Sequence, residues 1–119
     1  MIDVTVSIND DVGNKAVIFK SIVNALSLCS ESNDNEFCEQ QSIRVRKDDA
    51  MLRGNFIMFQ ATECMIDSIM DTIKNLTDGY PGVNLYVDLE RGNNIIGYHV
   101  TTYLIRSGHK YFIKTKTFN

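Results

Sequence analysis

A chain of 119 residues with 44% hydrophobic and 23% charged residues has the composition of one ordinary globular domain, long enough to bury a single core. Its net charge of −3 and pI of about 5.2 argue against a dedicated nucleic-acid-binding domain, which usually carries a basic total. No apolar run approaches the roughly 18 residues of a membrane span, and the N-terminus lacks the features of a secretory signal, so we expect one cytoplasmic domain over residues 1–119.

The use of cysteine fits a cytoplasmic protein. The three cysteines, Cys29, Cys38 and Cys64, are an odd number without CxxC spacing, which predicts reduced and mostly packed thiols rather than a disulfide framework. Asn and Ile are frequent and Ala is scarce, a bias that is typical of an AT-rich genome such as that of a bacteriophage.

The first third of the chain predicts a strand, a helix and an acidic loop. Residues 2–8 alternate apolar and polar side chains, as a strand with one buried face does. Residues 9–29 change to a spacing of three or four, which predicts a helix of about five turns with Asp10 or Asp11 at its N-cap. Its expected apolar stripe consists of Val12, Ala16, Phe19, Ile22 or Val23, and Leu26. Residues 30–41 carry four acidic side chains and little apolar surface, so we predict an acidic loop.

Alternation returns in the middle of the chain and then gives way to the clearest helix. Residues 42–47 and 51–60 predict two antiparallel strands joined by a turn. Residues 62–79 predict a helix that Thr62 caps and Gly79 ends. Its expected apolar stripe consists of Met65, Ile66, Ile69, Met70, Ile73 and Leu76.

The last third predicts three strands, over residues 83–90, 95–106 and 111–118, with a turn at RGNN and a hairpin turn at SGHK. The complete order is β-α-β-β-α-β followed by two more strands. Because both helices are amphipathic and need a common surface, we predict an α+β ferredoxin-like sandwich with two helices on one face of an antiparallel sheet and a C-terminal β-hairpin extension.

One short stretch raises the question of RNA binding. The sequence RGNFIMF, residues 53–59, lies on the predicted third strand and resembles the signature of the RNA-recognition-motif family over seven residues. The aromatic positions of that signature fall on Asn55, Ile57 and Gln60, and the companion position on the first strand falls on Thr5. Since the platforms that stack bases are missing, we interpret this stretch as an ordinary central strand and keep RNA recognition as a minority hypothesis.

Charge is divided unevenly along the chain. Residues 1–90 have a net charge of −8, whereas residues 91–119 have five basic residues and no acidic one. Regular alternation would place Lys110, Phe112, Lys114, Lys116 and Phe118 on one face of the last strand, with Arg106 nearby. An exposed edge that lysines protect from aggregation is the simpler interpretation, and a basic and aromatic surface that contacts nucleic acid or an acidic protein is the alternative.

The predicted second helix carries the opposite charge. Glu63, Asp67 and Asp71 are four residues apart and therefore line up on its solvent side. A solvated face is the simpler interpretation, and a contact for a basic partner is the alternative.

No specific catalytic motif is present. Asp10 and Asp11 would form a cation site if the fold brought them to Asp48, Asp49 or Asp88, as in small metal-dependent phosphodiesterases. Capping and turn formation are the simpler interpretation of Asp10 and Asp11. His99 and His109 have no partner at a metal-ligand spacing, and no cofactor is expected.

The leading hypothesis is therefore a small non-enzymatic binding or inhibitory module that engages another macromolecule, such as a host protein if the source is a bacteriophage. Nucleic-acid binding through the C-terminal hairpin is the second hypothesis, and a metal-dependent phosphodiesterase is the third. A homodimer formed through the sheet is compatible with the first, because the third strand has apolar residues on both faces.

Overall fold

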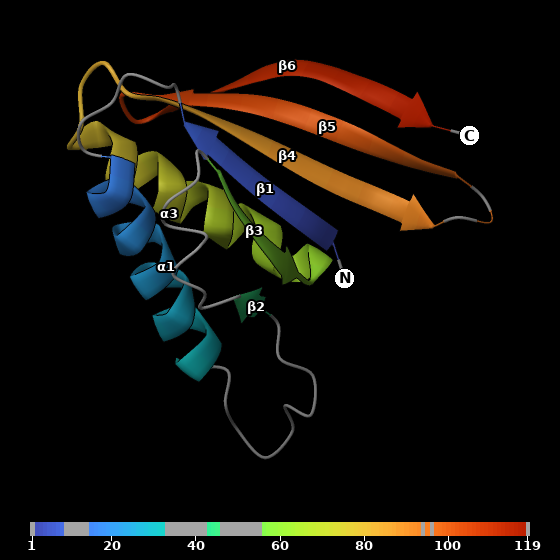
Figure 1. Cartoon of the computed structure of the whole chain (residues 1–119), viewed down its shortest axis with the longest axis horizontal. Helices are drawn as coiled ribbons and strands as arrows, with labels where there is room; N and C mark the ends of the chain where they lie inside the picture. Colours follow the sequence, from blue (N-terminus) through green and yellow to red (C-terminus); the bar gives the residue numbers. More distant parts are fainter. Residues whose placement is uncertain are drawn as a thin grey trace.

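A computed structural model describes residues 2–8, 15–32, 43–45, 56–93, 95 and 97–118. Within these residues, six strands form one antiparallel sheet in the order β2-β3-β1-β4-β5-β6, and two α-helices lie under the same face of the sheet (Figure 1). The elements are β1 Ile2–Ile8, α1 Lys15–Ser32, β2 Ile43–Val45, β3 Phe56–Ala61, the single 3-10 turn η1 Glu63–Met65, α3 Ile66–Asp78, β4 Asn84–Asn93, β5 Gly97–Arg106 and β6 His109–Phe118. The predicted α+β class, with an antiparallel sheet and two helices, is confirmed.

The core lies between the sheet and the two helices. Burial alternates along β1, where Val4 and Val6 are fully buried against the helices and the intervening polar residues lie on the opposite, open face of the sheet. Both helices contribute apolar side chains, and burying each of them fully stabilises the fold by about 1.5–3 kcal/mol. Among the helical residues whose burial is described, the buried ones are Ile18, Phe19, Ile22, Ile66, Ile69, Met70, Ile73 and Thr77.

The predicted apolar stripes are confirmed for α3 and partly wrong for α1. In α3 every predicted residue is buried or half-buried. In α1, Phe19 and Ile22 are buried as predicted, but Ala16 is exposed and Ile18 is buried in the core instead. Helical spacing alone allows the buried face of α1 to include either Ala16 or Ile18. Packing against the sheet buries Ile18, which has the larger side chain.

The start of α3 differs from the prediction. Thr62 makes no side-chain capping hydrogen bond, and its Oγ1 lies 3.3 Å from the Sγ of Cys64 instead. A 3-10 turn precedes the helix, so Met65 is at the N-cap of α3 and Glu63 lies before the helix rather than in it. At the other end Gly79 is the C-cap, as predicted, and its N–H donates to the carbonyl of Leu76.

The two C-terminal hairpins also differ from the expected boundaries. The first three residues of RGNN belong to a strand rather than a turn, because β4 continues to Asn93 and Gly92 pairs with Tyr98. Gly92 has a φ of 118°, and a Cβ there would lie 2.4 Å from the carbonyl oxygen of Gly97, so only glycine fits. The β5–β6 turn is shorter than SGHK: Ser107 and Gly108 have φ angles of 49° and 77°, the positive pair that a two-residue type I′ turn requires.

Several predicted features lie outside the described residues. These are the capping aspartates Asp10 and Asp11, the loop over residues 33–41, and Arg53 at the start of the RGNFIMF stretch. Helix α1 continues to Ser32, so residues 30–32 are helical rather than part of the acidic loop.

Candidate macromolecule-binding surfaces

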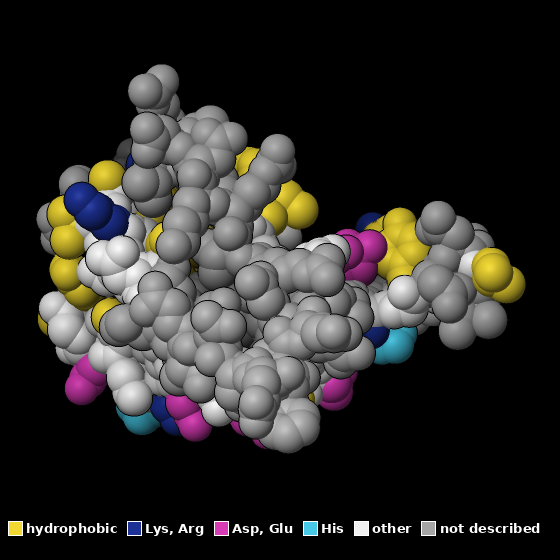
Figure 2. Space-filling model, turned by 90° about the horizontal axis from the view of Figure 1, so that it is seen from below, with side chains coloured by type: hydrophobic (Ala, Val, Ile, Leu, Met, Phe, Trp, Pro, Cys, Tyr) yellow, Lys and Arg dark blue, Asp and Glu magenta, His cyan; other side chains and the backbone are white. Residues whose placement is uncertain are grey.

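Among the described residues, strand β6 forms one edge of the sheet and pairs with β5 alone. All of its residues from His109 to Thr117 are exposed, on both faces of the sheet. The ends of the C-terminal strands extend beyond the helices in Figure 1, and in Figure 2 hydrophobic, basic, acidic and histidine side chains lie near the base of the arm that projects on the right. An edge strand of ten residues is therefore accessible over almost its whole length.

The prediction that five side chains of β6 share one face is wrong. The register against β5 shifts between Thr102 and Tyr103, since Thr102 pairs with Lys114 while Tyr103 pairs with Phe112. Ile113 is the extra residue of this β-bulge, and an extra residue turns the side chains that follow to the other face. Lys114, Lys116 and Phe118 consequently lie on the open face, whereas Lys110 and Phe112 lie on the helix side of the sheet.

Basic side chains of the hairpin lie against aromatic rings. The Nζ of Lys110 is 5.2 Å from the ring centre of Tyr103, and the Nζ of Lys116 is 5.2 Å from that of Phe118. The guanidinium of Arg106 lies 6.0 Å from the ring centre of Tyr111. At exposed sites such cation–π contacts contribute about 0.5–1 kcal/mol each, so a charged partner can draw these side chains away at small cost.

A shallow groove of about 360 Å³ crosses the open face next to β6. It is lined by Tyr86, Asp88, Val100, Thr102, Lys114, Lys116 and Phe118. The ring of Phe118 stacks on Tyr98 with a centroid separation of 4.9 Å, and Asp88 accepts a 2.6 Å hydrogen bond from Thr102. The groove thus combines two lysines with aromatic walls and a carboxylate that is already hydrogen-bonded.

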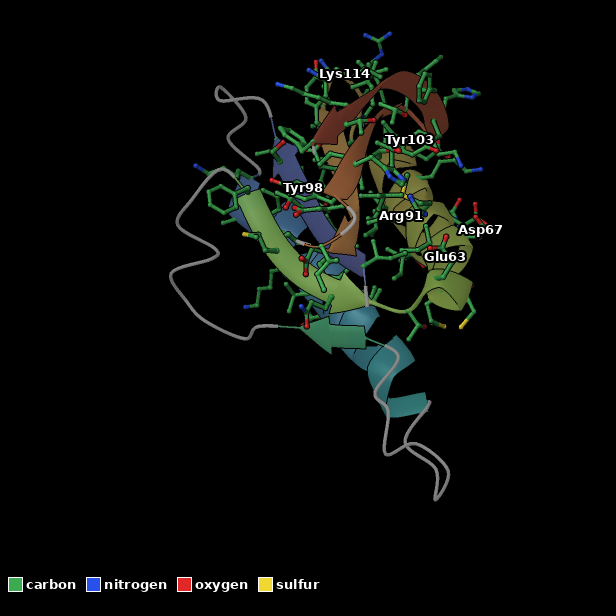
Figure 3. All side chains as sticks on the ribbon, turned by 90° about the vertical axis from the view of Figure 1, so that its right-hand side faces the viewer. Glu63, Asp67, Arg91, Tyr98, Tyr103 and Lys114 are labelled. Carbon is green, nitrogen blue, oxygen red and sulfur yellow. The ribbon has the colours of Figure 1, made fainter. Side chains whose placement is uncertain are left out.

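On the helix side, Glu63 and Arg91 form a bidentate ion pair that the sequence did not indicate. The Nε and one terminal nitrogen of Arg91 donate to the two carboxylate oxygens of Glu63 at 2.9 and 2.8 Å (Figure 3). The hydrogen bonds from Arg91 hold the pKa of the Glu63 carboxyl below its ordinary value of 4.5, and the same contact raises the pKa of Arg91. Glu63 is therefore paired with a cation of β4 and is not a free acid on a helix face.

The predicted acidic and basic surfaces meet around this ion pair. A hollow of about 270 Å³ is lined by Glu63, Ile66, Asp67, Met70, Leu89, Arg91, Tyr103 and Lys110. In Figure 3 the labelled side chains of Glu63, Asp67 and Arg91 lie in the same region of the view, with Tyr103 above them. Asp71 lies further along α3, with an oxygen 3.6 Å from the Nζ of Lys74. The row of Glu63, Asp67 and Asp71 is thus partly neutralised by basic neighbours.

On β3 the open face carries two exposed apolar residues. Phe56 and Met58 are 50% and 49% exposed, while Ile57 and Phe59 are buried on the helix side. Ile57, an aromatic position of the RNA-recognition signature, thus points away from the face on which bases would stack. On β1, Thr5 lies opposite Met58 and supplies no ring.

The predicted cation site depends on residues that the structure does not describe, except for Asp88. Asp10, Asp11, Asp48 and Asp49 lie outside the described residues, and Asp88 is hydrogen-bonded to Thr102. In the described part of the chain, no group of three or more His, Cys, Asp or Glu side chains is arranged to hold a metal ion. Cys64, predicted to be packed, is an exposed free thiol.

No protein-family model matches the chain, and searches of curated proteins and of solved structures found no significant match. Over the described residues, neither α-helix has the length and apolar character that crossing a bilayer requires.

Proposed function

We propose that the protein is a non-enzymatic cytoplasmic binding module that engages a protein partner through its C-terminal hairpin, with the edge of β6 as the contact. One observation carries this proposal: β6 is an edge strand of ten residues that is exposed on both faces and carries Lys110, Lys114 and Lys116 without any acidic residue. The rest of the chain is acidic, so this positive edge favours an acidic partner.

We also propose that the first four strands and both helices form a ferredoxin-like core to which the hairpin is added. The order β2-β3-β1-β4 supports this interpretation, with α1 between β1 and β2 in the chain and α3 between β3 and β4. The complete six-stranded sheet differs from that four-stranded arrangement because β5 and β6 extend it beyond β4. The core then serves as a rigid support, and the added hairpin serves as the contact.

The experiment that tests the proposed function is affinity capture from the natural host cells with two matched variants. The Lys114→Glu, Lys116→Glu double variant reverses the charge of the edge. A Lys20→Glu, Lys74→Glu double variant makes the same change in net charge on the helices, where Lys20 is exposed and Lys74 half-exposed. We expect a stoichiometric protein partner with the unmodified chain and the helix variant, and its loss with the edge variant. Equal capture by all three proteins would contradict the proposal.

A second candidate function is the binding of single-stranded nucleic acid in the groove on the open face. The observation that favours it is the juxtaposition of Lys114 and Lys116 with the rings of Tyr86 and Phe118, since lysines bind phosphates and rings stack on bases. Its test is binding to an oligothymidine at increasing salt: affinity that falls steeply with salt, and is lost in the edge variant only, would support nucleic acid as the partner.

A further inference from the structure

We propose that β6 takes up an extended peptide as a seventh strand of the sheet, and that this peptide has an apolar centre flanked by acidic residues. The inference rests on the proposed function and adds the chemistry of the partner. It depends on three properties of β6: its free backbone edge, an exposed apolar run, and the position of its lysines.

The backbone of β6 has hydrogen-bonding capacity on the side away from β5. In a strand, successive residues direct their N–H and C=O groups alternately to the two sides, so an edge strand presents every second residue to solvent. Since β6 pairs with β5 from His109 to Phe118 and no other described strand pairs with it, its other side offers a further strand the same length of backbone. An added strand would form a ladder of main-chain hydrogen bonds there.

The centre of β6 is apolar and exposed. Tyr111, Phe112 and Ile113 are consecutive in sequence and are 45%, 62% and 46% exposed. An edge that is only protected from aggregation carries charged or polar residues, and a run of three exposed apolar residues on an edge is a liability unless something covers it. Tyr111 lies on the open face and Phe112 on the helix side, so apolar surface is presented on both faces of the strand.

The lysines flank this apolar run. Lys110 precedes it, Lys114 and Lys116 follow it, and β6 contains no acidic residue. Among the described residues, the ammonium group of Lys114 makes no ion pair or ring contact. A peptide with valines opposite residues 111–113 and glutamates opposite the three lysines would complement the edge in both polarity and charge, because opposite charges on directly paired residues stabilise a sheet.

The same positions disfavour a second copy of β6 as the partner. When Phe112 and Ile113 are counted as one position because of the bulge, an antiparallel pair of two β6 strands centred on Lys114 or Thr115 places at least one lysine directly opposite another. Like charges in directly opposite positions are destabilising. An acidic strand removes this repulsion, so the charge pattern favours a different chain.

Nucleic acid explains fewer of the observations than a peptide does. The groove on the open face includes Lys114 and Lys116, but its Phe118 ring is already in contact with Tyr98 and with the ammonium of Lys116. Binding there would also leave Phe112, on the helix side, without a role. The peptide accounts for both the lysines and the apolar run.

The test uses the full chain and a fluorescent peptide with the core sequence Glu-Thr-Glu-Val-Val-Glu, which matches β6 in antiparallel register if one valine lies opposite both Phe112 and Ile113 of the bulge. Two control peptides replace either the glutamates with lysines or the valine whose N–H would donate to β6 with proline, which has no N–H to donate. Fluorescence anisotropy gives the dissociation constants, and NMR of the labelled protein shows which amides gain protection from hydrogen exchange. Circular dichroism verifies that each variant is folded.

We expect binding of the acidic peptide, protection of β6 amides that face away from β5, and at least about tenfold weaker binding by the Lys114→Glu, Lys116→Glu variant. A second variant, Phe112→Ser with Ile113→Ser, should also weaken binding, and neither control peptide should bind. The Lys20→Glu, Lys74→Glu variant should retain affinity within about twofold.

No binding, binding that maps to α3 or the open face, peptide-independent dimerisation through β6, or tighter binding of an oligothymidine would each overturn the inference. If the protein still captures a host partner in a lysine-dependent way but does not bind the peptide, the inference about the peptide is wrong and the proposed function stands.

Discussion

Thr77 of α3 accepts a 3.1 Å hydrogen bond from the backbone N–H of Gly108, which lies 31 residues later in the turn between β5 and β6. The Thr77 side chain is buried, and its hydroxyl in turn donates to the carbonyl of Lys74 at 2.7 Å. The same hydroxyl therefore satisfies a group of the helix and a group of the hairpin turn. This contact fixes one end of the C-terminal hairpin to the helical layer.

We expect Thr77→Val to lower the free energy of unfolding by about 1–3 kcal/mol, because valine keeps the shape of the side chain but leaves the Gly108 N–H without this partner. Urea unfolding followed by circular dichroism measures the change. Thr72→Val is the matched control: its hydroxyl donates to the carbonyl of Ser68 at an exposed site, so the loss should stay within about 0.5 kcal/mol. Equal losses in the two variants would show that the contact with the turn does not stabilise the hairpin.

Gly92→Ala should be strongly destabilising, by about 3 kcal/mol or more, because a left-handed backbone and a steric overlap act together. The added methyl group would lie 2.4 Å from the carbonyl oxygen of Gly97. Gly82→Ala separates the two causes, since Gly82 has a φ of 85° but no atom within 4 Å of the added Cβ. We expect only the conformational cost there, roughly 1–2 kcal/mol. Thermal unfolding of both variants checks the difference, and similar values would exclude the predicted overlap.

The Glu63–Arg91 ion pair predicts a specific pH dependence. Because hydrogen bonds from Arg91 lower the pKa of Glu63 below 4.5 in the folded protein, the pair stabilises the fold above pH 4.5, and this contribution is lost as the pH falls through the lowered pKa. In Arg91→Gln the Glu63 pKa should rise toward 4.5, as a carboxyl NMR titration would show. The difference in unfolding free energy between the two proteins should shrink in acid.

Lys74→Gln is the control for that titration, because Lys74 pairs with Asp71 and not with Glu63. It should leave the midpoint of Glu63 in place. If the titration midpoint of Glu63 is the same in Arg91→Gln as in the unmodified protein, the ion pair is absent in solution.

The two phenylalanines of β3 test which face of the strand is buried. Phe59 is 4% exposed, so Phe59→Ala should cost about 3–5 kcal/mol of unfolding free energy. Phe56 is 50% exposed on the open face, and Phe56→Ala should cost less than about 1 kcal/mol. Denaturant unfolding of the pair gives the answer. A larger loss of stability for Phe56→Ala than for Phe59→Ala would contradict this orientation of β3 and would mean that Ile57 faces the open side of the sheet.

Periodicity predicted the elements whose burial is one-sided. In β1, Val4 and Val6 face the core and alternate with residues of the open face, and in α3 the buried Ile69 and Ile73 are one helical turn apart. These patterns follow directly from the geometry of strands and helices, so the class of fold could be inferred from the sequence. The phase of α1 could not, because Ala16 and Ile18 both fit a helical stripe and only contact with the sheet distinguishes them.

The candidate surface was less predictable because it depends on a single inserted residue. The prediction that alternate residues share a face holds only in a regular strand. The one bulge residue, Ile113, places Lys110 and Lys114 on opposite faces of the sheet. A signal was present: the three consecutive apolar residues 111–113 interrupt the alternation that the rest of the strand follows. The partnership of Glu63 with Arg91 had no local signal, because it joins residues 28 positions apart through the packing of η1 near β4.

The hydrogen bond that holds the turn of the C-terminal hairpin to α3 has a mechanical consequence. The turn at Gly108 is fastened to α3 through Thr77, whereas Phe118, at the other end of β6, contacts the ring of Tyr98 on the neighbouring strand β5. Twisting motions of the hairpin therefore increase with distance from this turn. The backbone of β6 is most rigid next to the turn, so we expect an added strand to form its first hydrogen bonds there and to pair progressively toward the C-terminus.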